Sequence, residues 1–128
     1  MRLLLDTNAL IWWLNDDERM TRRVRRVLDS GQHDVFVSAA SAWEIATKVR
    51  LGKLKFAAGF LADFDASIRA LNFEPLPVTS HHAVVGAQLP GAYGDPFDRM
   101  LAGQAAVERL NVVTSDPAIG ALGVETLW

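Results

Sequence analysis

The sequence predicts an α/β fold, in which a short parallel sheet carries helices on both of its faces. Apolar runs typical of buried strands alternate along the chain with helical patterns, and this alternation indicates parallel strands joined by right-handed crossovers. Leu3-Leu4-Leu5 is a continuous apolar run, as expected for a strand that is buried on both faces. The 128 residues suit one domain, 1–128, with four or five short strands and no internal repeat or linker.

The first half of the chain contains two strand patterns and three helical patterns. The predicted elements are a strand at 2–6, helices at 9–14 and 20–29, a strand at 35–37 and a helix that stops at 51–52. Thr7 or Asn8 can cap the first helix, and Gly31 ends the second. Ser38 or Ser41 begins the third helix, and a capping box from Ser41 would place Glu44 in its first turn.

The second half of the chain continues the same alternation. The predicted elements are an amphipathic helix at 58–71, an extended segment at 73–78, helices at 80–89 and 96–109, and strands at 111–114 and 124–127. Two prolines restrict the 73–78 segment to the edge of the sheet. Thr79 or Ser80 caps the next helix, and we expect His81 and His82 in its exposed first turn.

The composition excludes several classes of protein. The chain has no cysteine, which removes disulfides and thiolate metal sites and fits a cytoplasmic protein. No apolar run approaches the roughly 18 residues of a membrane span, and the residues after Met1 lack the pattern of a signal peptide. The net charge of −2 argues against a uniformly basic nucleic-acid-binding protein, so any phosphate contacts must come from local patches.

Two such patches are present, and a solvated surface is the alternative interpretation of the first. The first basic cluster consists of Arg22, Arg23, Arg25 and Arg26, and the second consists of Lys48, Arg50, Lys53 and Lys55. Trp12 and Trp13 suggest a different contact. Adjacent residues of a helix cannot share a face, so one of the two is expected to meet a second subunit or a partner helix unless both are partly buried within the monomer.

Four carboxylates stand where predicted strands end or helices begin: Asp6, Glu44, Asp98 and Asp116. Each alone is explained by helix capping or by the preference for acids in a first turn. In a parallel sheet, however, strand ends and the starts of the following helices share one rim, so the four should converge there. Crowded carboxylates repel one another, and an all-oxygen set of this kind favours Mg²⁺ or Mn²⁺.

A carboxylate-held divalent cation is typical of phosphodiester hydrolysis. No covalent route competes with it, because Ser38, Ser41 and Ser115 lack a spaced His and Asp partner. A phosphotransfer protein of similar topology is disfavoured, since Asn8 stands where a haloacid-dehalogenase-type phosphatase needs a second acid. A receiver domain is disfavoured as well, because it would need adjacent acids after its first strand and a Lys after a late strand, and this chain lacks both. A binding module whose acids only cap helices remains the non-enzymatic alternative.

Four segments of the chain resemble, in the family's order, segments of the PIN-domain nucleases and, among them, of the VapC toxins of bacterial toxin–antitoxin pairs. Together the four segments span nearly the whole chain. They are Leu3–Asn8, Ser41–Ile45, Asp95–Leu101 and Val113–Asp116. The resemblance implies a three-layer fold with strand order 3-2-1-4-5 and Mg²⁺- or Mn²⁺-dependent endoribonuclease activity. It also implies homodimers and a cognate VapB-type antitoxin. A catalytically inactive PIN-fold module that binds RNA or protein is the alternative.

The resemblance also implies roles for individual residues. It assigns the acidic quartet, Asp6, Glu44, Asp98 and Asp116, to metal binding and catalysis. The expected supporting polar groups are Thr7, Asn8, Asp95, Thr114 and Ser115. Asp95 is interpreted as the cap of the helix that presents Asp98, with an Asp95–Arg99 ion pair as the alternative. Many relatives carry His where this chain has Tyr93.

Overall fold

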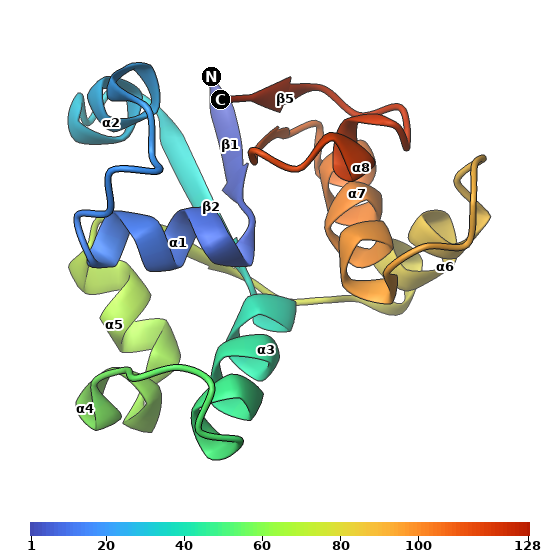
Figure 1. The fold of residues 1–128 in the computed structure, drawn as a ribbon. Helices are drawn as coiled ribbons and strands as arrows, with labels where there is room; N and C mark the ends of the chain where they lie inside the picture. The colour runs from blue at the N-terminus through green and yellow to red at the C-terminus, as the bar shows by residue number, and fades with distance from the viewer.

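The computed structural model describes residues 1–128 and has a five-stranded sheet at its centre (Figure 1). The strands are β1 (Arg2–Leu5), β2 (Asp34–Ser38), β3 (Glu74–Leu76), β4 (Asn111–Val113) and β5 (Thr126–Leu127). Their order across the sheet is β3-β2-β1-β4-β5, and every neighbouring pair is parallel. This confirms the predicted fold class and strand order, and it places the proline-containing β3 at an edge, as predicted.

Eight helices connect and cover the strands. They are α1 (Thr7–Leu14), α2 (Arg22–Asp29), α3 (Ala39–Arg50), α4 (Ala58–Ala62), α5 (Phe64–Ala70), α6 (Ser80–Gln88), α7 (Pro96–Glu108) and α8 (Pro117–Gly120). None of them combines the length and the apolar composition that crossing a membrane would require.

Alternate residues of β1 belong to the two cores that make the fold three-layered. Leu3 and Leu5 pack with α1, α2, α3 and α5 on one face of the sheet. Leu4 packs with α7 and α8 on the other face. All three leucines are fully buried, and each such burial contributes roughly 1.5–3 kcal/mol. Both faces of the strand that ends at Asp6 are therefore held by packing.

One predicted helix boundary was wrong, and at another the structure decides between two predicted caps. The expected helix at 58–71 is divided into α4 and α5 by Asp63, whose φ of −142° is extended and whose Oδ1 accepts from Ala66 N over 3.1 Å. The third helix begins one turn earlier than a Ser41 capping box requires, because Ser38 is its N-cap and accepts from Ala40 N over 3.0 Å. Glu44 therefore lies in the second turn of α3, not the first.

The expectation for the His81–His82 pair was wrong for His82, which is only 2% exposed. Its Nδ1 accepts from Thr79 N over 3.0 Å, and its Nε2 lies 2.9 Å from Glu108 Oε1 on α7. The burial follows from a close crossing of α6 and α7. A Cβ placed on Gly103 would come within 2.5 Å of the His82 carbonyl oxygen, so only glycine allows the helices to approach this closely.

Both tryptophans of α1 are half-buried by residues of the chain itself. The Trp12 ring meets Trp128 edge-on with their centroids 5.5 Å apart, and the Arg19 guanidinium lies 4.8 Å from the Trp12 ring centroid. Trp13 packs against Phe73. These contacts agree with the alternative that both tryptophans are partly buried within the monomer. A subunit interface at α1 remains a prediction.

Candidate active site

All four acids of the predicted quartet line one cavity of about 130 Å³ at the carboxyl edge of the sheet. Asp6 follows β1, Asp116 lies between β4 and α8, Asp98 is in the first turn of α7, and Glu44 is on α3. The other lining residues are Thr7, Asn8, Lys48, Asp95, Phe97, Leu101 and Ser115. Side chains separated by up to 110 residues are brought together because parallel strands end on the same rim.

Three acids at this rim also cap helices, so the interpretation of each as a helix cap is confirmed. Asp6 Oδ1 accepts from Ala9 N over 2.7 Å, and Asp116 Oδ1 accepts from Ala118 N over 2.9 Å. Asp95 Oδ1 accepts from Phe97 N over 2.8 Å, which confirms Asp95 as the cap of α7. Each cap uses Oδ1, so the same carboxylate can hold a helix start and present Oδ2 to a ligand.

Burial and mutual repulsion raise the pKa of two of the acids. The pKa of Asp98 rises to about 6, mainly because of burial and then because Asp95, Asp116, Asp6 and Glu44 are close. Burial is also the main cause of the raised pKa of Asp6, opposed by the Thr114 hydroxyl and the Ala9 N–H, and Asp116 and Glu44 add to it. The carboxylates thus share one electrostatic field in which negative charge predominates.

The supporting polar residues hold the elements around the cavity in place. Thr7 Oγ1 donates to Ser41 Oγ over 2.9 Å, a buried bond that joins the start of α1 to α3. Thr114 Oγ1 accepts from Asp116 N over 2.9 Å and orients the turn that carries Asp116. Ser41 was considered as a cap and rejected as a nucleophile, and its role in positioning α3 had no signal in the sequence. Asn8 and Ser115 are exposed and line the cavity.

The donors around the cavity fit a hard divalent cation by their chemistry, since they are carboxylate, hydroxyl and amide oxygens. No three His, Asp or Glu side chains stand in position to hold one ion directly. Mg²⁺ usually keeps several of its waters and binds through one or two carboxylates, so direct ligation by three is not required. The raised pKa values add a physical reason, because a dication would relieve the repulsion that causes part of them.

The two basic clusters lie differently with respect to this cavity. None of the arginines of the first cluster lines it, and α2 lies near the N-terminus in Figure 1, away from the start of α3. Arg25 is paired with Asp16, Oδ1 to Nη1, over 2.6 Å, whereas Arg22, Arg23 and Arg26 are exposed. In the second cluster Lys48 alone lines the cavity, and its Nζ lies 3.7 Å from Glu44 Oε2.

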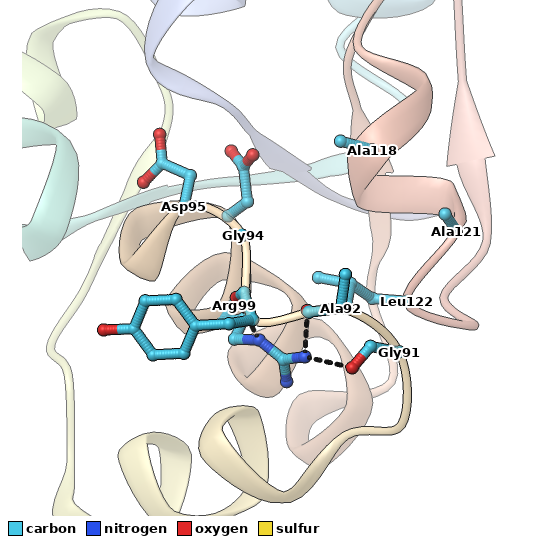
Figure 2. A pocket seen from close by; sticks show the side chains of 10 residues that line it. Gly91, Ala92, Gly94, Asp95, Arg99, Ala118, Ala121 and Leu122 are labelled. Atoms are coloured by element: carbon cyan, nitrogen blue, oxygen red, sulfur yellow. Dashed lines mark hydrogen bonds between the residues drawn. The ribbon is translucent and has the colours of Figure 1, made fainter.

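A second cavity of about 230 Å³ adjoins the first and shares Asp95 and Asp98 with it (Figure 2). Its wall is a loop organised by Arg99, whose guanidinium donates to five main-chain carbonyls. The acceptors are Gly86, Leu89, Gly91, Ala92 and Tyr93. All five N–H donors are used, so the alternative Asp95–Arg99 ion pair does not form. The sequence had no signal for this role of Arg99, because its acceptors are main-chain atoms.

The fold is similar to those of several solved structures. VapBC2 from Rickettsia felis bound to a promoter DNA fragment matches with a TM-score of 0.72 and 15% identity, covering 99% of this chain and 98% of that one. FitAcB from Neisseria gonorrhoeae matches with a TM-score of 0.67 and 25% identity, covering 98% and 96%. A toxin–antitoxin complex from Klebsiella pneumoniae matches with a TM-score of 0.66 and 17% identity, covering 98% and 96%.

No curated protein matches the sequence significantly. The family model of the PIN domain, in contrast, matches residues 3–124. That range contains β1 from Leu3 onward, β2 to β4, all eight helices and the whole acidic quartet. Sequence and fold therefore agree, and the chain belongs to the PIN domain family.

Proposed function

We propose that this chain is the toxin of a VapBC-type toxin–antitoxin pair and acts as a Mg²⁺- or Mn²⁺-dependent endoribonuclease. The observation that carries the proposal is the single cavity in which the four acids of the quartet meet, together with Asp95, in a PIN domain. The solved structures similar to this chain, which include a toxin–antitoxin complex, support the toxin assignment.

In this proposal Asp6, Glu44, Asp98 and Asp116 would hold the cation, partly through its water ligands. When bound, such an ion supplies Lewis-acid activation of water and charge stabilisation at the phosphoryl group. The pKa of Asp98, raised to about 6 without the cation, is expected to fall when the cation binds, because the ion favours the carboxylate form. Thr7 and Thr114 keep α1, α3 and the Asp116 turn in register, so that the four carboxylates are held ready before substrate arrives.

RNA binding requires positive charge outside the acidic cavity. We assign this role to the exposed Arg22, Arg23 and Arg26, with Arg25, and to Arg50 and Lys53 of the second cluster. The net charge of −2 leaves only such local patches to attract the phosphate backbone.

Homodimerisation is the second part of the proposal, and an exposed aromatic surface beside the cavity supports it. Trp43 is 60% exposed and stacks on Phe97 with a centroid separation of 5.2 Å. Both line an open apolar cavity of about 450 Å³ together with Val78, Pro96 and Met100. Exposed apolar patches rimmed by polar residues commonly mark protein interfaces. A cognate VapB-type antitoxin is the other proposed partner.

The nuclease proposal is tested by incubating the purified chain and its Asp6→Asn variant with RNA and Mn²⁺. Asn is as good an N-cap as Asp, so the variant keeps the bond to Ala9 N and removes only the negative charge. We expect cleavage by the natural chain and loss of cleavage in the variant. Glu18→Gln, which removes an exposed acid with no hydrogen-bond partner in the chain, is the matched control and should cleave normally. Equal cleavage by the Asp6 variant would contradict the proposal.

An inactive binding module is the second candidate, favoured by the capping roles of Asp6, Asp95 and Asp116. The two candidates differ in the response of stability to metal. A functional cation site raises the melting temperature as Mn²⁺ is added, because only the folded chain binds the ion tightly. A module whose acids serve only as caps shows no such shift.

A further inference from the structure

Lys48 is the only positively charged side chain among the residues that line the acidic cavity. It lies on α3 one turn after Glu44, and its ammonium nitrogen is 3.7 Å from Glu44 Oε2. Its side chain is 38% exposed, so it is neither locked in the core nor free in solvent. Five carboxylates, from Asp6, Glu44, Asp95, Asp98 and Asp116, line the same cavity.

This imbalance of charge creates a difficulty for a nuclease. A phosphodiester is an anion, and a cavity of five carboxylates repels it. One bound dication together with Lys48 does not neutralise five ionised carboxylates. The arginines of the first basic cluster do not reach the cavity, and Arg99 has no free donor because its five N–H groups bind carbonyls. Lys48 is therefore the one cation in the lining of the cavity that can face a phosphate there.

We propose that the Lys48 ammonium group donates a hydrogen bond to a non-bridging oxygen of the phosphodiester that is cleaved, and so acts as a catalytic residue. The inference rests on the proposed endoribonuclease function. In the step it assists, a water oxygen bonds to phosphorus and loses its proton to solvent. The bond from phosphorus to O3′ breaks, and O3′ takes up a proton from solvent. Lys48 stays protonated and opposes the charge that develops on the phosphoryl oxygens.

The pair with Glu44 also determines where the Lys48 ammonium group lies. An i, i+4 pair on an open helix surface contributes little to stability, and such a pair alone would give Lys48 no role in the reaction. Here the acid partner points into the cavity, so the pair draws the ammonium group to the place where the substrate phosphate must sit. A flexible point charge suits this task, because it can move from carboxylate to phosphate as substrate binds.

The test compares Lys48→Gln, Lys48→Arg and the natural chain on a mixed-sequence single-stranded RNA oligonucleotide. Single-turnover rates are measured at saturating RNA and Mn²⁺, with RNA affinity and the Mn²⁺-induced rise in melting temperature measured in parallel. We expect Lys48→Gln to cleave about 100-fold more slowly, as is typical when one donor to a developing oxyanion is lost. Lys48→Arg should recover much of that rate. RNA affinity should change little, and the Mn²⁺-induced shift should be kept or increased.

Arg69→Gln serves as the control, since Arg69 is an exposed cation on α5 outside both cavities and its removal changes the net charge equally. It should cleave at the natural rate. If Lys48→Gln cleaves at the natural rate, the inference is overturned but the proposed function is not. The same holds if Lys48→Gln loses both cleavage and the Mn²⁺-induced rise in melting temperature, because Lys48 would then act through Glu44. A natural chain that binds Mn²⁺ but cleaves no RNA overturns the proposed function itself, and the inference with it.

Discussion

The helix that presents Asp98 is fixed to the rest of the domain by a glycine contact, and breaking that contact should destabilise the fold. A Cβ added at Gly103 would lie 2.5 Å from His82 O, 2.7 Å from Gly86 N and 2.8 Å from Gly86 Cα. All three atoms belong to the backbone of α6, so no side-chain rotation relieves the clash. In Gly103→Ala the two helices must therefore move apart.

The expected loss of stability follows from the contacts at the crossing of α6 and α7. Overpacking typically costs 1–3 kcal/mol, and a clash with backbone alone places this variant near the upper end, at about 3 kcal/mol. Separation also strains the His82–Glu108 contact, which spans the two helices over 2.9 Å. For a chain of this length, 3 kcal/mol corresponds to a fall in melting temperature of roughly 10 °C.

Thermal unfolding followed by circular dichroism measures this change, and Gly59→Ala is the matched control. Gly59 is also in a helix, but a Cβ there would meet nothing within 4 Å. Alanine should stabilise that position by up to about 1 kcal/mol, because it has the higher helix propensity. A Gly103→Ala variant as stable as Gly59→Ala would refute the reasoning that backbone contact sets the distance between α6 and α7.

Two further predictions concern residues near the cavity. Without metal, the raised pKa of Asp98 means that its carboxyl group keeps a proton in the folded chain that it releases in the unfolded chain above the ordinary pKa of 3.8. The free energy of unfolding should therefore fall as the pH rises from about 4 to about 6 and change little above pH 6. Asp98→Asn should weaken this dependence in urea unfolding with EDTA, and an unchanged profile would show that Asp98 is not its source. Arg99→Lys keeps the charge but provides three donors in place of five, so it should cost about 1–2 kcal/mol and speed chymotrypsin cleavage after the exposed Tyr93. Arg69→Lys, at an exposed position, should leave that cleavage rate unchanged.

Patterns of hydrophobicity along the chain were sufficient for the types and order of most elements, but not for every boundary. The apolar residues Phe60, Leu61, Phe64 and Ile68 keep helical spacing across Asp63, so the break between α4 and α5 was not visible in the periodicity. Ser38 and Ser41 were equally suitable caps. The end of β2 decided between them, because the strand continues to Ser38 and α3 begins directly after it.

The convergence of the four acids could be predicted because it depends on a general property of parallel sheets. Two of the acids follow strands and the other two lie in the first two turns of helices, and all strands of such a sheet end on the same rim. The same reasoning could not identify Lys48 or Arg99. Lys48 was grouped with Arg50, Lys53 and Lys55, and only the tertiary structure places it, unlike them, at the cavity.

The sequence by itself determined the strand and helix patterns, the acids at their ends and the likeness to PIN domains, because local periodicity and capping chemistry are encoded by residues close together in the chain. Tertiary structure alone decided that His82 is buried, that Arg99 binds five carbonyls and that Lys48 enters the cavity. These outcomes depend on how closely helices cross and which way their faces turn. Contacts between distant residues set both, and no short stretch of sequence contains that information.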